Sequence, residues 1–264
     1  MRSATRSALS STQAVLAELG GSADLATGAE ILAAGRVVAG SSQLLTLLAD
    51  PTADVVGKKA VIDRVFAGQA TTTRAVLTAV AGARWSSQQD LLAGIEDAGI
   101  RAVAATAGPG TSIEAELFAF ETAVRSDAGL ELALGTKLGS PAEKSALVER
   151  LIGGKSSAQT VTILSALVQQ PRGRRIGELV RDASRIVADQ AEKVVATVIT
   201  ATALSEAQAA RVARGLSARY GKDIIVNHVV DPKVVGGVRV QVGGDVIDGT
   251  VSTRLADLRL QLAG

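Results

Sequence analysis

Residues 229–262 constrain the fold of this chain most, because their proline and glycines leave the backbone few conformations. Pro232 fixes its own φ and keeps Asp231 out of the helical region, so the apolar run before it is predicted to end there as a strand. Gly236 and Gly237 follow. Two adjacent glycines beside a strand are typical of a bulge or of the close approach of another backbone, and a plain flexible loop is the alternative.

A β-hairpin is predicted next. Residues 238–242 alternate between valine and a polar side chain, which is the period of a strand with one buried face. The sequence Gly-Gly-Asp at residues 243–245 suits a tight turn, and residues 246–248 would return antiparallel. Gly249 would end the return strand, with a positive φ where the strand meets a helix.

That helix is predicted to close the chain. Thr250 and Ser252 are its candidate N-caps, because their hydroxyl groups can accept a backbone N–H of the first turn. Arg254 and Arg259 would point away from an apolar face. The apolar residues on that face recur at helical spacing, and they are Val251, Leu255, Leu258 and Leu262.

This series of residues resembles the C-terminal signature of the delta subunit of F-type ATP synthases, whose mitochondrial member is the oligomycin-sensitivity-conferring protein. The resemblance rests on the Asp-Pro turn, the glycine pair, the hairpin at residues 243–251 and the Arg-Leu pair in the last helix, in the family's order and spacing. The residues assigned to the signature, with a structural role, are Asp231, Pro232, Gly236, Gly237, Asp245, Asp248 and Gly249. The possible partner contacts are Arg254, Leu255 and Leu258.

The resemblance implies a non-catalytic subunit of the peripheral stalk, without a cofactor. Its helical part would bind the N-terminal ends of the alpha subunits of the catalytic head, and its C-terminal domain would bind subunit b. The subunit would hold the stator, so that rotor torque drives ATP synthesis. It would lie on the cytoplasmic side of the cell membrane, held there through the complex. Common delta chains are shorter than this one, which is similar to the long actinobacterial type.

The part of the chain before the signature is predicted to be helical and duplicated. Apolar residues follow helical spacing from residue 2 to about 190. Residues 61–68 match residues 147–154 at an offset of 86, and the match includes Arg64 with Arg150 and Gly68 with Gly154. Such a repeat indicates two related helical units. Helices are predicted over residues 24–39, 43–49, 54–66, 72–83 and 90–106 in the first unit.

Turn and capping signals set the domain boundaries. The sequence Gly-Pro-Gly at residues 108–110 interrupts any helix, and Ser140 with Glu143 forms a capping box. Residues 193–203 are rich in β-branched side chains, and Ser205 would cap a helix ending at Tyr220. We therefore predict a mainly α chain with helical units at residues 1–107 and 111–192. A β-α-β-β-β-α domain at residues 193–264 completes it.

Composition excludes several classes of function. The chain has 28 basic and 26 acidic residues, so its charge does not favour nucleic-acid binding. It has no cysteine, which excludes disulfides and thiolate metal sites. No apolar run reaches about 18 residues, so we expect no direct membrane insertion, and subunit b would be a separate chain.

Four local features have simpler structural interpretations. Residues 153–156 end like a phosphate-binding loop but follow a helix and lack its first glycine. His228 has no catalytic or metal-ligating neighbours in sequence, and Trp85 is expected in the core. The arginines at positions 172, 174, 175, 181 and 185 are either a solvated helix start or a patch for an acidic partner. The rival functions are a general helical adaptor and, third, an enzyme.

Overall fold

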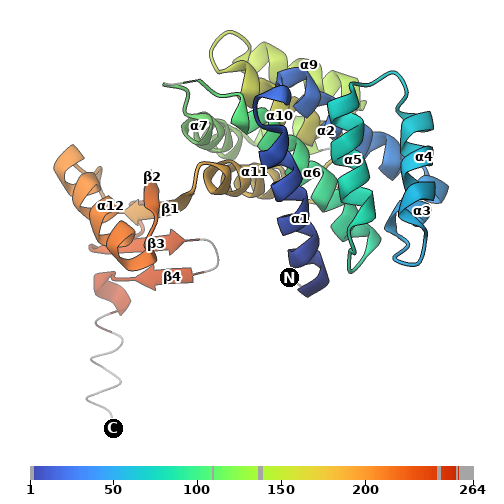
Figure 1. The fold of residues 1–264 in the computed structure, drawn as a ribbon. Coiled ribbons are helices and arrows are strands. Elements are labelled where there is room, and N and C mark those ends of the chain that lie inside the picture. The colour runs from blue at the N-terminus through green and yellow to red at the C-terminus, as the bar shows by residue number, and fades with distance from the viewer. Residues whose placement is uncertain (1–2, 109, 136–138, 243–244, 254, 256–264) are drawn as a thin grey trace. The chain divides into compact units, whose positions relative to one another are not determined.

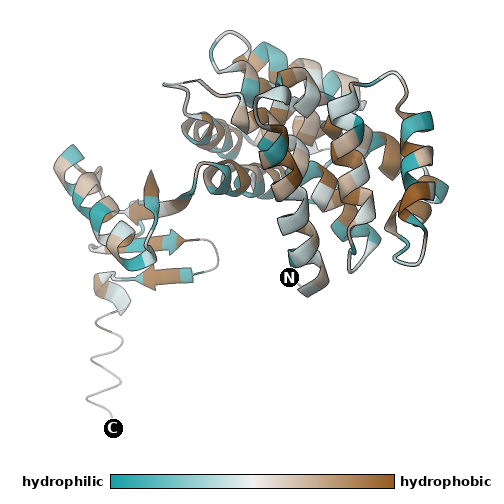
Figure 2. Cartoon of the chain, viewed as in Figure 1, coloured by the Kyte–Doolittle hydropathy of each residue, from teal (hydrophilic) through white to brown (hydrophobic). Residues whose placement is uncertain are grey.

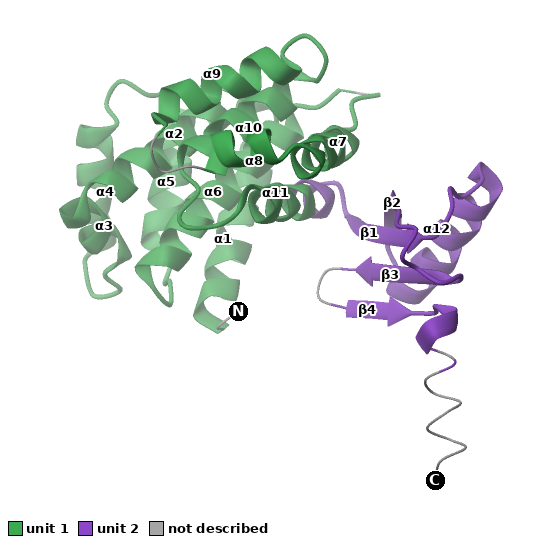
Figure 3. Cartoon of the chain, turned by 180° about the vertical axis from the view of Figure 1, so that it is seen from behind, with its two compact units in different colours: residues 1–186 green, residues 187–264 purple. Residues whose placement is uncertain are grey.

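The computed structural model describes residues 3–108, 110–135, 139–242, 245–253 and 255. The chain forms two compact units, residues 1–186 and 187–264 (Figure 3). The first is helical and the second contains a four-stranded sheet (Figure 1). The predicted fold class, mainly helical with a small C-terminal α/β part, is confirmed.

The helices follow one another with short connections. The fold begins with α1 (Ser3–Leu19), the 3-10 turn η1 (Gly20–Ser22), α2 (Leu25–Gly40), α3 (Ser42–Ala49), α4 (Val55–Val65), α5 (Thr71–Gly82) and α6 (Gln88–Ala105). It continues with α7 (Ile113–Ser126), α8 (Ala128–Gly135), α9 (Pro141–Ile152), α10 (Ala158–Gln169) and α11 (Ile176–Gln190).

Side-chain caps begin many of these helices. Ser140 and Glu143 form the predicted capping box at α9. Asp127 was not expected to act as a cap, yet its carboxylate accepts the N–H groups of Gly129 and Leu130 at the start of α8, at 2.9 and 3.0 Å. Helices α7 and α8 are not among the predicted helices, although an aspartate before an apolar run is a signal that locates α8.

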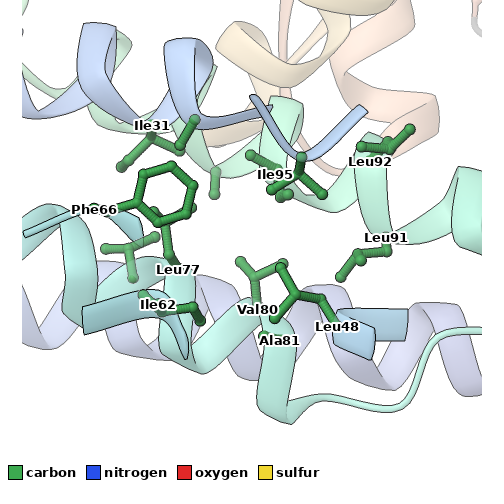
Figure 4. Packing of buried hydrophobic residues seen from close by; sticks show 14 of the residues in the cluster. Ile31, Leu48, Ile62, Phe66, Leu77, Val80, Ala81, Leu91, Leu92 and Ile95 are labelled. Carbon is green, nitrogen blue, oxygen red and sulfur yellow. The ribbon is translucent and has the colours of Figure 1, made fainter. Parts of the chain in front are cut away.

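The first core is built around α6, which is buried on nearly all sides. Glycines allow α2 to approach it closely: a Cβ on Gly28 would lie 2.5 Å from Val103 Cγ2, and one on Gly99 would lie 2.6 Å from Leu32 Cγ. Branched and aromatic residues fill the space between α2, α4, α5 and α6 (Figure 4). The labelled core residues include Ile31, Ile62, Phe66, Leu77, Leu91 and Ile95.

Two polar groups are buried in this core with satisfied hydrogen bonds. Lys58 Nζ donates to the carbonyl oxygens of Leu48 and Ala81, each at 2.9 Å, near the C-terminal ends of α3 and α5. Its burial lowers the pKa of this lysine. Trp85 is a core residue, as expected, and its Nε1 donates to the carbonyl of Val80 at 2.7 Å.

Corresponding contacts recur along the helical region. Glu30 accepts the Ala70 N–H at 3.0 Å and the Thr73 hydroxyl at 2.6 Å, and so caps α5 from α2. Glu116 on α7 caps α10 in the same way through Ser157 and Thr160. These residues lie 86, 87 and 87 positions apart (30 and 116, 70 and 157, 73 and 160). The correspondence supports the duplication, and the division into two helical units stays a prediction.

The C-terminal unit contains β1 (Lys193–Thr200), α12 (Glu206–Tyr220), β2 (Asp223–Val230), β3 (Val238–Val242) and β4 (Asp245–Asp248). Its sheet has the strand order β2-β1-β3-β4, with β1 and β2 parallel and the other pairs antiparallel. One face packs against α12 through Ala196, Val198, Val240 and Leu216. His228 shares a 2.7 Å hydrogen bond with the Thr200 hydroxyl, which fits its predicted structural role.

Among the described residues, no single helix has the length and apolarity to cross a membrane. The pair α2 and α3 meets those criteria only when taken together, and it is bent by 108°.

Candidate partner-binding surfaces

The glycine pair of the signature is a place where two backbones meet. Gly236 and Gly237 have φ values of +64° and +79°. A Cβ on Gly237 would lie 2.4 Å from the carbonyl oxygen of Gly249. The Gly236 carbonyl accepts the N–H of Val251 at 3.3 Å, and the Gly249 N–H donates to Val238 at 2.9 Å. Of the three interpretations of this pair, close approach of another backbone is therefore the correct one.

The Asp-Pro turn is tied to the end of the central strand. Asp231 donates its N–H to the carbonyl of Thr200 at 2.9 Å. Its side chain accepts the N–H of Lys233 at 2.9 Å, and its carbonyl accepts that of Val234 at 3.0 Å. Pro232 occupies the exposed turn that these bonds define. The turn thereby delivers the chain from β2 to the glycine pair.

Asp248 joins the hairpin to the closing helix. Its carboxylate accepts the N–H of Thr250 at 3.0 Å and two guanidinium N–H groups of Arg239 at 2.9 and 2.8 Å. The hydrogen bonds from Thr250, together with those from Thr253 and Arg239, hold the pKa of Asp248 well below its usual range. Thr250 is the N-cap, because its Oγ1 accepts the Thr253 N–H at 3.4 Å.

One prediction at this junction is wrong. Gly249 does not have a positive φ, because the glycine pair and the Asp248 side chain already turn the chain there. Space is nevertheless tight, since a Cβ on Gly249 would lie 3.2 Å from the Val238 carbonyl oxygen. Asp245 is exposed at the start of β4 and pairs in register with Val242, as the predicted hairpin requires.

The partner contacts inferred from the resemblance can be placed only in part. Leu255 is 52% exposed, and Val251, one turn earlier on the predicted apolar face, is 42% exposed. Arg254 and Leu258 lie outside the described residues. The contact role of these three residues stays a prediction.

The sheet has a second face, opposite α12, that is apolar on β1 and β2, whereas β3 places Arg239 and Gln241 on it. β1 places Val195 and Ile199 on it, in register with Ile225 and Val229 of β2. Val246 of β4 belongs to the same face and is 60% exposed. Figure 2 shows brown, hydrophobic segments on these strands. Strands that are apolar on both faces are typical of sheets covered on both sides, and the described helix α12 covers one side.

A groove lies along α1 in the helical unit of residues 1–186. It has a volume of about 890 Å³ and runs between one face of α1 and the segment that connects α5 to α6. Ala4, Ala8 and Trp85 supply its apolar lining, and serine hydroxyls and Arg84 supply its polar lining. The sequence reading missed this groove, although the serines and alanines that recur along α1 were a visible signal.

The arginine-rich segment before and within α11 is largely engaged in internal ion pairs. Arg172 and Arg174 both contact Glu96 of α6 at 2.7 Å. Arg181 contacts Glu121 of α7, also at 2.7 Å. The paired side chains of Arg172 and Arg174 are 13% and 22% exposed, so these two arginines are neither a solvated helix start nor a free patch.

The comparisons with known proteins agree with the signature. The family model for the ATP synthase delta (OSCP) subunit matches residues 100–262, more than half of the chain. The chain belongs to this family. It is 54% identical over 264 residues to the ATP synthase subunit delta of Leifsonia xyli, with all of both chains covered.

Two further relatives support the same assignment. The chain is 37% identical to the subunit delta of Kineococcus radiotolerans, over 90% of this chain and 88% of that one. It is 34% identical to that of Thermobifida fusca over the full length of both. A chain in the cryo-EM structure of the Toxoplasma gondii mitochondrial ATP synthase hexamer covers 64% of this chain and 96% of its own, with 19% identity. Its TM-score of 0.40 is too low to support any conclusion.

The chain is thus a delta subunit of ATP synthase, a component of the peripheral stalk. This assignment decides against the general helical adaptor that the sequence left open. Apart from Asp245, which lies at the other end of β4, the signature residues are gathered at one junction of the C-terminal unit, where they fix the backbone between β2, the hairpin and the closing helix. Their hydrogen bonds and close contacts are internal, so their role is structural. The exposed apolar residues of this unit, such as Val251 and Leu255, are different residues.

Proposed function

We propose that this delta subunit is a non-catalytic coupling subunit that joins two other subunits of the ATP synthase. Its helical unit would bind the N-terminal segments of the alpha subunits, and its C-terminal unit would bind subunit b. The link would keep the catalytic head from turning with the rotor, so that proton-driven rotation is coupled to ATP synthesis. The subunit would lie on the cytoplasmic side of the membrane, held through the complex.

The second, apolar face of the C-terminal sheet supports the contact with subunit b. Val195 and Ile199 of β1 and Ile225 and Val229 of β2 are adjacent on this face, whereas the exposed Val246 of β4 is separated from them by Gln241 of β3. Contiguous apolar surface of this kind marks sites of protein interaction. The exposed Val251 and Leu255 at the start of the closing helix add to the apolar surface of this unit.

Binding of the full chain to the soluble part of subunit b tests the proposal. Val229→Glu places a charge within the apolar residues of β1 and β2 on the second face and is expected to weaken binding by about tenfold or more, as loss of a central interface residue does. Val230→Glu is the matched control, because Val230 is 49% exposed and lies on the α12 side of the sheet. Leu255→Glu tests the helix in the same assay. Wild-type chain that fails to bind subunit b would contradict the proposal.

A further inference from the structure

The connection between α10 and α11, residues 170–175, is fastened to earlier helices by its side chains. Arg174 makes a bidentate ion pair with Glu96 of α6, with Nη–Oε distances of 2.9 and 2.7 Å. Arg172 contacts the same carboxylate at 2.7 Å. Gln170 donates to a backbone carbonyl of α2 at 3.4 Å. One carboxylate, whose side chain is only 14% exposed, thus holds two guanidinium groups, and we call these three residues the Glu96 cluster.

The backbone of this connection is strained at Arg172. Its φ is +50°, a conformation that residues other than glycine rarely adopt, and Gly173 beside it has a φ of +80°. A non-glycine residue keeps such a conformation only where its surroundings hold it there. The ion pair with Glu96 provides that hold, so loss of the ion pair would leave the strained turn unsupported.

The corresponding connection in the first half of the helical region is built differently. Residues 83–87 join α5 to α6 as residues 170–175 join α10 to α11. They are fastened through hydroxyl groups, since Thr5 Oγ1 donates to Ser86 Oγ at 2.9 Å and lies 3.1 Å from a carboxylate oxygen of Asp90. A connection of this kind therefore does not need two arginines on a carboxylate, which suggests a separate role for the Glu96 cluster.

The packing of α11 shows why an additional contact matters there. Its buried face carries Ile176, Leu179, Val180 and Ala183, and Ser184 is 7% exposed beside them. The Ser184 hydroxyl has no hydrogen-bond partner among the described residues. Burial of an unsatisfied hydroxyl opposes docking of the helix, whereas burial of the apolar side chains favours it. The charged contacts then add to a docking energy that these two opposing effects reduce.

We propose that the Glu96 cluster is a latch that docks α11 on the helical unit, and that opening the latch frees α11 while α1–α10 stay folded. Arg174 also contacts Asp182 at 3.3 Å, so the cluster joins α6 to α11 itself. The other ion pair of α11 has an Arg181 side chain that is 57% exposed and is therefore weaker. Because α11 leads directly into β1, the latch also sets whether a docked or a free helix carries the C-terminal unit.

The latch does not depend on which subunits the chain binds, and the isolated full chain is enough to test it. The chain has no cysteine, so one introduced thiol reports where the structure opens. Ser184→Cys places a thiol of similar size on the buried face of α11. Its rate of reaction with a thiol-specific reagent follows the fraction of time for which α11 is open. Glu96→Gln leaves two partly buried guanidinium groups without their carboxylate, and should raise this rate at least about tenfold.

Two controls separate the latch from general stability. Val76→Cys places a thiol on α5 in the core around α6, where the side chain is fully buried, and its reaction rate should not change with Glu96→Gln. Glu149→Gln makes the same chemical change at an exposed position of α9, and it should leave the reaction rate at position 184 unchanged.

Arg172→Gly is a second latch variant that separates charge from strain. It removes one ion pair, and glycine accepts the positive φ, so a faster reaction at position 184 would come from the lost charge. Equal reaction rates at position 184 with and without Glu96→Gln and Arg172→Gly would overturn the latch. Equal acceleration at positions 76 and 184 in both variants would overturn it as well, because α11 would then open only when the whole helical unit unfolds.

Discussion

Among the described glycines of the C-terminal unit, Gly237 is the one where an added methyl group has least room. Its φ is +79°, and the added Cβ would meet backbone atoms, which cannot rotate away. Gly237→Ala is therefore expected to destabilise the unit by more than about 1 kcal/mol through strain at a positive φ alone. Thermal unfolding of the full chain, followed by circular dichroism, measures the effect.

The control for this change lies in the same unit. Gly215 is in the middle of α12, and nothing lies within 4 Å of a Cβ built on it. Gly215→Ala should be neutral or stabilising, by roughly 0.5 to 1 kcal/mol, because alanine loses less conformational freedom in a helix. Equal thermal unfolding midpoints for Gly237→Ala and Gly215→Ala would show that the close approach of residues 237 and 249 does not require glycine at position 237.

Asp248 should make the C-terminal unit sensitive to acid. The folded state lowers its pKa, so its contribution to stability is complete above the unfolded pKa of about 4 and is lost as pH falls through the folded pKa. Asp248→Asn should therefore be less stable than the wild type at neutral pH, and the difference should shrink below about pH 4. Thermal midpoints across this range measure the difference.

Asp245→Asn is the control for the pH series, because Asp245 is exposed at the other end of β4. Its midpoint should follow that of the wild type at neutral pH. A difference between Asp248→Asn and the wild type that stays constant down to the lowest pH would mean that the carboxylate charge at position 248 is not the stabilising feature.

At the scale of elements, two glutamate side chains cap the N-termini of helices that are distant from them in sequence. Glu30 caps α5 and Glu116 caps α10, each through a backbone N–H and a threonine hydroxyl. Hydrogen bonds to charged groups contribute about 1.5 to 3 kcal/mol, so Glu30→Ala and Glu116→Ala should each destabilise the helical unit by an amount of that order. Urea unfolding followed by Trp85 fluorescence measures it.

The double variant tests whether the two caps act independently. They share no partner, so their effects should add to within about 0.5 kcal/mol. Glu149→Ala, at an exposed position of α9, should change stability little and is the control. If only one of the two cap variants is destabilised, the two glutamate caps do not contribute equally to stability, although they occupy corresponding positions.

Local chemistry explains which elements could be predicted from the sequence. The capping box at Ser140, the N-cap at Ser205 and the pairing of β3 with β4 depend on residues close together in the chain, and all three were predicted. The groove along α1 and the ion pair of Arg172 depend on packing between segments more than 70 residues apart in the sequence. No local pattern encodes those contacts, so neither the groove nor the ion pairs could be predicted.

Gly249 illustrates a different limit. The sequence places a glycine between a strand and a helix, where a positive φ is the usual reason for one. In the structure Gly236 and Gly237 have that conformation. Gly249 belongs to the backbone segment that Gly237 approaches, and its small size leaves space for this contact. A glycine can therefore be required either for its own positive φ or because another segment packs closely against it. Only the three-dimensional structure distinguishes these two reasons.

At the scale of the whole molecule, the division into two compact units has consequences for folding. The boundary falls within α11, between residues 186 and 187. A fragment that ends at residue 191 keeps α11 complete and retains the core around α6. It is expected to keep nearly all of its helical signal and its cooperative unfolding, while losing binding to subunit b. Circular dichroism and a binding assay on the same fragment decide the matter.

The two units also predict how the full chain binds its partners. Each unit is large enough to present an interface near the standard buried area of about 1,600 Å². If one chain carries both proposed interfaces, the second contact within an assembled stalk becomes intramolecular, which can raise overall avidity by about 10² to 10⁴ over either contact alone. We therefore expect two moderate affinities in isolation and tight retention only when both partners are present together.

Calorimetry of the full chain and of residues 1–191 and 192–264, each against the alpha N-terminal peptide and the soluble part of subunit b, measures these affinities. The formal net charge is only +2, so long-range steering contributes little and affinity should fall only modestly as salt rises. The helical fragment should bind the alpha peptide alone, and the C-terminal fragment should bind subunit b alone. One fragment that binds both partners as tightly as the full chain would show that the second unit adds nothing to the link, and coupling through two separate contacts would be wrong.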